Sequence, residues 1–160
     1  MSFSLERGDL AILNALQDDA DKPMAEIAEL AGLSLSTCWR RVKLLKEAGI
    51  IRKTVALIDA RAAGLSFAVE TSVTLKEHGQ KNRRQFEEFA ERRPEIMECR
   101  HLTGQRDYQL RIVTPDLAAY EHFLTSVLLE QPSVSAVVSN IVLREVKATT
   151  ALPLDLLRRS

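Results

Sequence analysis

The stretch GLSLSTCWRRVKLLKEAGIIRK, residues 32–53, contains the signals that decide the fold of the N-terminal half. Gly32 and Leu33 predict a turn, and Ser34 is a favourable N-cap for the helix that follows. Ala48 and Gly49 predict the end of that helix. Its apolar positions recur at helical spacing and define one buried face: Leu35, Cys38, Val42 and Leu45.

Two further helices precede this one, and a strand-like segment follows it. Apolar residues predict a helix over about 5–17 and a second over 24–31, with Pro23 at its first position. Residues 50–58 have the composition of a strand. Three short helices, a glycine turn before the third and a strand after it predict a winged or wing-like helix-turn-helix.

Charge is distributed unevenly along a chain whose formal net charge is zero. Residues 34–53 contain six basic residues and one acid, a net charge of +5. Residues 1–33 contain two basic residues and seven acids, a net charge of −5. Positive charge concentrated on one helix and the segment after it is typical of proteins that bind nucleic acids.

The third helix therefore predicts a DNA-reading element. Ser36, Thr37 and Arg40 are placed to reach base edges in a major groove, because they lie early on its polar face. The remaining basic residues suit phosphate contacts and are Arg41, Lys43, Lys46, Arg52 and Lys53. The alternative is an ordinary solvated helix face. Trp39, at the edge of the apolar face, is expected to pack rather than to stack on bases.

The second half has a different pattern. Residues 67–75 alternate between apolar and polar types, which predicts a strand, and residues 80–93 predict a helix ended by Pro94. Later segments predict two antiparallel strands, a helix between Pro115 and Pro132, and a last strand over 134–146. The order β-α-β-β-α-β is ferredoxin-like. We therefore predict an α+β chain with a helix-turn-helix domain at 1–60, a hinge at 61–66 and a ferredoxin-like domain at 67–160.

The segment Thr103-Gly104-Gln105-Arg106-Asp107-Tyr108 predicts a tight turn between two strands. Gly104 permits a close backbone approach, and exposed amides with the Asp107 carboxylate are able to hold the zwitterionic head of a small ligand. From residue chemistry alone, a plain hairpin turn explains the segment better.

Several functional classes find no support in the sequence. No apolar run approaches the roughly 20 residues that span a bilayer, and the N-terminus lacks the pattern of a signal peptide. Cys38 and Cys99 lie far apart and are expected to be small buried residues of a reducing cytosol, with a redox role for Cys38 as the alternative. The three histidines lack metal-ligand spacing, and no catalytic constellation is present, so we expect neither a metal nor an enzyme.

Four collinear segments resemble the leucine-responsive regulator/AsnC family of transcription regulators. They are IAELAGLSLSTCWRRVKLLKEAGII, IDARAAGL, TGQRDYQLRIV and LREVKATTALPL, and together they span most of the chain. The resemblance implies a DNA-binding N-terminal domain and a C-terminal domain that senses an amino acid. It also implies dimers formed by paired sheets, and often tetramers, octamers or larger rings.

The resemblance changes the interpretation of the turn. It implies that an effector, usually an amino acid, binds there at a contact between dimers. With the resemblance, ligand binding is preferred over a plain hairpin turn as the interpretation of this segment. Gly104, Asp107 and Tyr108 match the family turn, Leu102 and Thr103 lead into it, and Gln105 and Arg106 fill variable positions. Ser139 and Asn140, on the last strand, are further effector-binding candidates.

We therefore expect a cytoplasmic, homo-oligomeric regulator that binds double-stranded DNA, responds to an amino acid and has no other cofactor. Two alternatives remain at this point. One is a nucleoid-architectural protein with little sequence preference. The other is a small-molecule-binding domain without DNA function, because ferredoxin-like folds serve many functions.

Overall fold

The computed structural model describes residues 4–159, with side chains to residue 157. The chain forms two compact units. The first, here called the N-terminal unit, contains the described residues up to Leu57 together with those from Lys147 onward. The second, the sheet unit, is Ile58–Val146. Each unit has its own hydrophobic core and is described separately.

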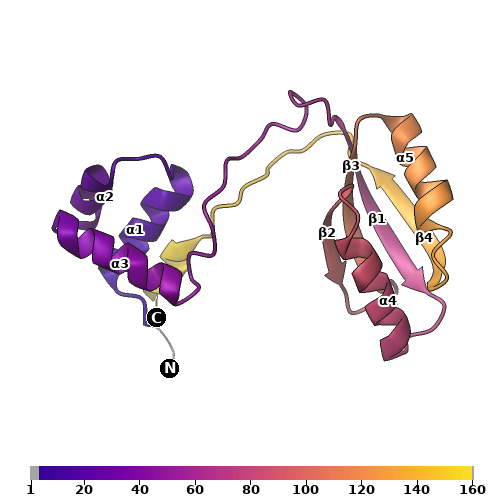
Figure 1. Ribbon diagram of the computed structural model, residues 1–160, viewed down its shortest axis with the longest axis horizontal. Helices are drawn as coiled ribbons and strands as arrows, with labels where there is room; N and C mark the ends of the chain where they lie inside the picture. The colour runs from indigo at the N-terminus through magenta and orange to yellow at the C-terminus, as the bar shows by residue number, and fades with distance from the viewer. Residues whose placement is uncertain (1–3, 160) are drawn as a thin grey trace. The chain divides into compact units, whose positions relative to one another are not determined.

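Three helices make the body of the N-terminal unit (Figure 1). They are α1 (Arg7–Asp18), α2 (Met24–Ala31) and α3 (Leu35–Glu47). Glycines with positive φ follow two of them, Gly32 at 66° and Gly49 at 71°, and the Ser34 hydroxyl accepts a hydrogen bond from Thr37 N at 3.2 Å. The predicted cap, turn and stop are thus confirmed, because each depends on residues adjacent in the sequence.

The apolar stripes of the three helices meet in one core. Its buried members are Ile12, Ala15, Ile27, Ala28, Cys38, Val42 and Leu45. Gly8 lies where α1 passes the turn before α3, and a Cβ there would lie 3.3 Å from the Leu33 side chain. This close approach fixes where α1 crosses the helix-turn-helix.

The predicted strand over residues 50–58 is wrong. Residues 52–59 have no regular secondary structure, and Val55, Leu57 and Ile58 expose 57%, 74% and 74% of their surface. No described segment of the chain pairs with them. A strand needs a partner that supplies its backbone hydrogen bonds, and strand-like composition does not provide one.

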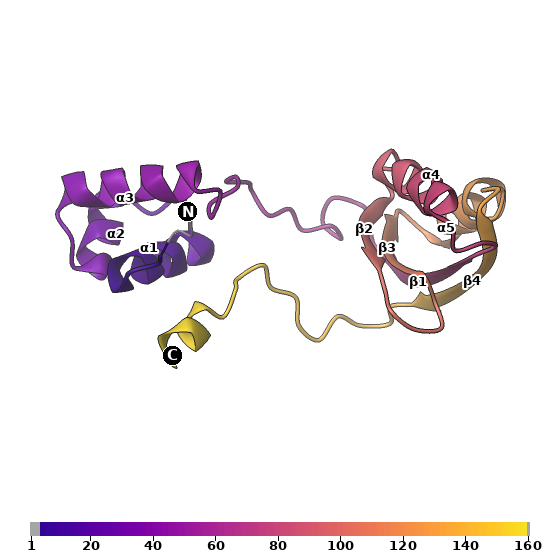
Figure 2. The same ribbon diagram turned by 90° about the horizontal axis from the view of Figure 1, so that it is seen from below.

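The sheet unit has the predicted β-α-β-β-α-β order. Its elements are β1 (Phe67–Leu75), α4 (Gln80–Glu91), β2 (Ile96–His101), β3 (Tyr108–Thr114), α5 (Leu117–Phe123) and β4 (Val134–Ile141). The four strands are antiparallel and follow the order β2-β3-β1-β4. Both helices cover the same face of the sheet, as Figures 1 and 2 show.

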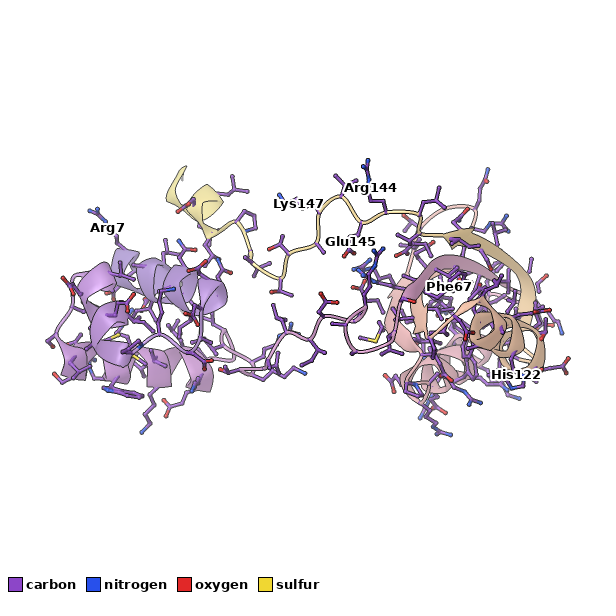
Figure 3. The ribbon with its side chains drawn as sticks, turned by 90° about the horizontal axis from the view of Figure 1, so that it is seen from above. Arg7, Phe67, His122, Arg144, Glu145 and Lys147 are labelled. Atoms are coloured by element: carbon purple, nitrogen blue, oxygen red, sulfur yellow. The ribbon has the colours of Figure 1, made fainter. Side chains whose placement is uncertain are left out.

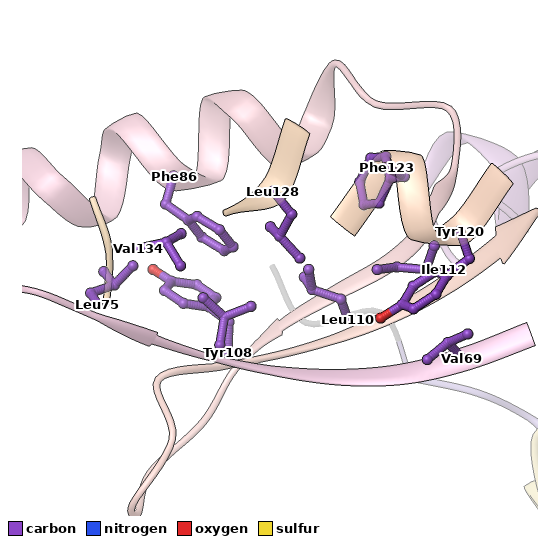
Figure 4. Packing of buried hydrophobic residues seen from close by; sticks show 11 residues of the cluster. Val69, Leu75, Phe86, Tyr108, Leu110, Ile112, Tyr120, Phe123, Leu128 and Val134 are labelled. Atoms are coloured by element: carbon purple, nitrogen blue, oxygen red, sulfur yellow. The ribbon is translucent and has the colours of Figure 1, made fainter. Parts of the chain in front are cut away.

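The two faces of the sheet differ. The covered face holds the core, where Phe86 of α4 and Tyr120 and Phe123 of α5 meet strand residues such as Leu110 and Ile112 (Figure 4). The alternate strand residues form the open face. They include Glu70, Ser72, Gln109, Arg111, Val138 and Asn140. Hydrogen bonds link Ser72 to Gln109 at 2.8 Å and Gln109 to Glu70 at 3.1 Å, so this polar face is internally ordered.

Two late elements are shorter than predicted. Helix α5 ends at Phe123 and continues as a π-helical turn, Leu124–Leu128, before Pro132. Strand β4 ends at Ile141. Val142 N still donates to Ala68 O of β1 at 3.0 Å, and the chain then leaves the sheet as an irregular segment. Arg144, Glu145 and Lys147 lie on the irregular segment that follows (Figure 3). On this segment, Glu145 Oε1 accepts a hydrogen bond from Arg111 Nη2 at 2.9 Å.

The residues from Lys147 onward belong to the N-terminal unit, although they were predicted to form part of the ferredoxin-like domain. Gln17 of α1 explains this, because its side-chain amide both donates to Leu152 O and accepts from Leu152 N, at 2.9 Å each. These partners lie 135 residues apart, so no local pattern indicates the contact. Among the described residues, no helix is long and apolar enough to cross a membrane.

Candidate functional sites

The polar face of α3 is open to solvent. Ser36, Arg40 and Lys43 are exposed there, and Lys43 makes only a surface contact with Glu47 at 3.7 Å. Lys46, Arg52 and Lys53 are exposed as well. At about 1.5 Å rise per residue the helix is roughly 20 Å long. Such a helix fits the major groove of B-DNA, with its cations available to phosphates.

At the N-terminus of α3, the Ser34 cap also orders the two predicted hydroxyl readers. Ser34 Oγ lies 2.8 Å from Thr37 Oγ1 and 3.2 Å from Ser36 Oγ. Thr37 is partly buried, whereas Ser36 is exposed. Ser36 is therefore better placed than Thr37 to reach a base edge, and the cap restricts where its hydroxyl points.

Arg41 departs from its predicted role as a phosphate contact. Its guanidinium turns toward α1, where Nε donates to Asp9 Oδ1 at 2.7 Å and Nη2 contacts Asp9 Oδ2. Nη1 lies 3.4 Å from Glu6 Oε1, and the side chain is only 15% exposed. The physical reason is the helical rotation of about 100° per residue, which directs Arg41 and the neighbouring Arg40 to different sides of α3.

Trp39, expected to pack at the edge of the apolar face, is 57% exposed, so less than half of its surface packs against the protein. Leu35, one turn earlier on the same helix, is 48% exposed although it was predicted to be buried. The core takes Cys38, Val42 and Leu45 instead, which leaves an apolar edge beside the basic face.

The turn between β2 and β3 projects from the sheet and is exposed from Leu102 to Arg106. Gly104 has a φ of 135°, which side chains rarely adopt. The turn closes through Leu102 N, which donates to Asp107 O at 2.8 Å. Thr103 and Gln105 lie on the exposed part, and Arg106 donates to Thr74 Oγ1 at 3.1 Å.

Asp107 already has partners within the chain. Its Oδ2 accepts from Leu75 N at 2.7 Å, and its Oδ1 lies 2.9 Å from His78 Nδ1. The carboxylate side chain is only 17% exposed, so it anchors the turn to the end of β1. His78 was missed in the sequence because it is 29 residues away and belongs to no motif.

Tyr108 does not lie on the exposed turn. The residue is 1% exposed. The centroid of its ring lies 4.7 Å from that of Phe86 and 5.0 Å from that of His101. Its hydroxyl donates to Glu87 Oε1 at 2.8 Å. Burial and the hydrogen bond to Glu87 raise the pKa of this phenol. The strand alternation decides this, because Tyr108 shares the covered face with Leu110.

Ser139 and Asn140 are not brought to the turn within one protomer, because β1 separates β4 from β3. The Ser139 hydroxyl lies on the covered face, 2.5 Å from the Tyr120 hydroxyl. Asn140 pairs with Glu70 and belongs to the open face.

A shallow groove of about 420 Å³ lies beside the turn, between α4 and β2. It is lined by Glu87, Ala90, Glu91, Ile96, Met97, Glu98, Cys99, His101 and Tyr108. In the part of the chain that the structure describes, no cluster of three or more acidic, histidine or cysteine side chains is arranged to hold a metal.

The cysteines differ in position. Cys38 is buried in the N-terminal core, 3.5 Å from Met24 Sδ, and burial raises its pKa. Cys99 is exposed on the edge strand β2, contrary to expectation. Local desolvation and the charges of Glu87 and Glu91 raise its pKa to about 11. Neither site favours the thiolate, so neither resembles a redox sensor.

Both halves match known families. Residues 6–52 match a family described as winged helix-turn-helix DNA-binding, and residues 69–152 match the Lrp/AsnC ligand binding domain. The chain is 34% identical to the transcriptional regulator AzlB of Bacillus subtilis over 97% of its own length and 99% of that protein's. It is 38% identical to the Bkd operon transcriptional regulator of Pseudomonas aeruginosa, over 94% and 98% of the two chains.

A solved relative extends the match to the whole fold. It is a transcriptional regulator from Neisseria meningitidis in complex with L-Met, with a TM-score of 0.92 at 34% identity, covering 96% of this chain and 99% of that one. All three relatives are transcriptional regulators. With an exposed basic α3 in the first unit and a βαββαβ sheet in the second, the chain belongs to the Lrp/AsnC family of DNA-binding transcriptional regulators.

Proposed function

We propose that the protein recognises specific DNA sequences by placing the exposed face of α3 in the major groove. The observation that supports this most directly is the exposure of Ser36, Arg40 and Lys43 on one face of a capped helix. Arg40 suits a bidentate contact to guanine, and Ser36 suits a single hydrogen bond. The exposed Lys46, Arg52 and Lys53 supply phosphate contacts. We also propose that it acts in the cytoplasm, where the DNA of its bacterial relatives lies.

We further propose that the protein works as a dimer or a larger assembly of itself. The open face of the sheet has no helix over it, and Val138 exposes 40% of its surface there. A second sheet packed on this face would cover Val138. Two copies of α3 would then read half-sites about 34 Å apart, or a multiple of that distance.

For the ligand, we propose an amino acid bound at the turn of residues 102–107. The match to a ligand binding domain and the L-Met complex of the Neisseria relative support an amino acid. Because the Asp107 carboxylate has partners within the chain, exposed backbone groups near Gly104 are the better contacts for the ligand. A second dimer would complete the site, since one protomer holds Ser139 and Asn140 on the other side of β1.

Binding measured on two DNAs at several salt concentrations tests the DNA proposal. The probes are a duplex enriched from a randomised pool by the protein and a scrambled duplex of the same composition. We expect the enriched duplex to bind at least a thousandfold more tightly at physiological salt. Equal affinity for both would instead support the nucleoid-architectural alternative.

The ligand proposal has a separate test. Calorimetric titration with each of the twenty amino acids should give binding heat for at least one. Gly104→Val should abolish that heat, because its φ of 135° is strained for a branched side chain and the turn must change. Leu129→Ala, an exposed apolar position outside the turn, is the control and should bind normally. Absence of heat with all twenty would leave the turn with a structural role only.

A further inference from the structure

Asp9 is an ionised carboxylate inside the N-terminal unit. It occupies the first turn of α1 and is 0% exposed. Its Oδ2 accepts from Glu6 N at 2.9 Å, and its two oxygens receive the guanidinium of Arg41 from α3. Burial alone would raise the pKa of Asp9, but the hydrogen bonds from Arg41 and Glu6 N outweigh it and lower the pKa. The charge is therefore kept, and Arg41 balances it.

This pair differs in kind from the other contacts between α1 and α3. The core contacts of Ile12 with its neighbours are apolar and tolerate small rotations of a helix. A planar guanidinium that meets a carboxylate through two nitrogens has one favourable orientation. The ion pair thus limits the rotation of α3 about its own axis, while the apolar core limits its distance from α1.

Rotation of α3 decides which side chains meet a DNA groove. Arg40 immediately precedes Arg41 on α3. The orientation of the Arg41 side chain therefore fixes the direction in which Arg40 leaves the helix. Ser36 lies one turn earlier on the same exposed face as Arg40. A change of a few tens of degrees would move both away from the base edges that they reach, without removing any positive charge from the helix.

We propose that Asp9, acting through Arg41, is a positioning residue for DNA reading. It holds α3 at the rotation that presents Ser36 and Arg40 to the bases, although neither Asp9 nor Arg41 touches DNA. This inference rests on the proposed sequence-specific binding. It assigns discrimination between sequences to a buried pair that links the first helix to the third.

Two single variants test the role. Arg41→Lys keeps the positive charge but loses the two-point geometry, and Asp9→Asn keeps the shape but loses the negative charge. Affinities for the enriched and scrambled duplexes are measured across a salt series, at a temperature where circular dichroism shows each variant fully folded. Lys53→Ala is the comparison, because an exposed phosphate contact should lower the slope of log affinity against log salt by about one.

The positioning role predicts that both variants lose at least tenfold in the ratio of enriched to scrambled affinity, with a salt slope equal to that of the wild type. If Arg41 instead binds phosphate, Arg41→Lys keeps the ratio, and Asp9→Asn tightens both duplexes alike. If the pair only stabilises the fold, the melting temperature falls and the ratio stays unchanged. Either of these results overturns the inference.

The double variant Asp9→Asn with Arg41→Gln covers the case in which the single variants do not fold. It removes both charges together, so no unpaired charge is left buried. We expect it to fold and to show a reduced ratio, because two amides do not reproduce the two-point ion pair. A wild-type ratio in the double variant would contradict the role. A wild-type protein that does not distinguish the two duplexes would instead refute the proposed function itself.

Discussion

The Asp107 carboxylate accepts a hydrogen bond from Leu75 N at the end of β1, with 2.7 Å between Oδ2 and N. The ladder between β1 and β3 ends at the pair Val73–Tyr108, and the pairing with β4 is irregular between Thr74 and Leu75. The Asp107 side chain therefore helps to hold the turn to the end of β1, together with the bond from Arg106 to Thr74 and the backbone bond from Asp107 N to Val73 O at 3.0 Å.

Replacing Asp107 should loosen both segments. In Asp107→Ala the buried Leu75 N–H loses its acceptor, which costs about 1–3 kcal/mol, whereas Asp107→Asn keeps an oxygen and should cost less. We expect Leu75 to exchange its amide hydrogen faster in the Ala variant than in the Asn variant, as measured by NMR. DNA binding should persist in both, while the response to an amino acid is lost with Ala. Equal exchange in all three proteins would contradict this account.

A chain of hydroxyl groups crosses the sheet core. Thr71 Oγ1 lies 3.1 Å from the Tyr120 hydroxyl, which lies 2.5 Å from Ser139 Oγ. Thr71 is fully buried, so Tyr120→Phe should lower the free energy of unfolding by about 1–2 kcal/mol. Tyr108→Phe is the matched control and should cost less, because its partner Glu87 is exposed and water can replace the lost bond. Chemical denaturation of both variants measures the difference, and a larger loss in the control would refute the argument.

Asp9 makes the N-terminal unit sensitive to acid. Its pKa in the folded chain is lowered below the ordinary value of 3.8, so its contribution to stability is present above that value and is lost as the pH falls through the folded pKa. Fluorescence of Trp39, the one tryptophan in the chain, reports unfolding of this unit. Asp9→Asn should cost about 3 kcal/mol at neutral pH and should flatten the loss below about pH 4. An unchanged acid transition in that variant would disprove the assignment.

Thiol labelling should separate the two cysteines. Cys99 is exposed and has a pKa of about 11, so its labelling rate should rise through pH 9 and 10 as the thiolate fraction grows. Cys38 is buried, so it should react only when the N-terminal unit opens. Mass spectrometry of each peptide after labelling measures both rates, with Cys99→Ser identifying the fast site. Rapid modification of Cys38 at pH 7 would reopen a redox role.

The tail contact at Gln17 is testable by proteolysis. Gln17→Ala removes both hydrogen bonds to Leu152, so chymotrypsin should cleave the tail faster near Leu156, with little change in helix content. Asn14→Ala is the control, because it removes only the 3.0 Å contact between Asn14 and Gln17. Identical cleavage of the wild type and the Gln17 variant would show that the tail is held by other contacts.

The parts of the fold that were predictable depend on neighbours in the sequence. The Ser34 cap, the Gly49 stop and the alternation in β1 each lie within a few residues. The exposed basic face of α3 follows from the same helical period. A pairing across a long separation leaves no such local sign. Arg41 was predicted to contact phosphates because its partner, Asp9, is 32 residues away in the sequence.

The turn of residues 102–107 shows the same limit. Its position and its glycine were evident, but the direction of Tyr108 depends on register with Val73, and the partners of Asp107 come from β1 and the segment after it. The predicted strand over residues 50–58 failed for the complementary reason, because the described chain supplies no partner strand for it.

The bond between Gln17 and Leu152 has a consequence during synthesis. The N-terminal unit is assembled from two distant segments, so a nascent chain that has produced α1 to α3 still lacks the residues that bind Gln17. At about 5–20 residues per second, the ribosome needs on the order of ten seconds to add the 105 residues from the end of α3 at Glu47 to Leu152 (152 − 47). The helices must remain folded through that interval on their own core, and the sheet unit is translated before the tail can dock.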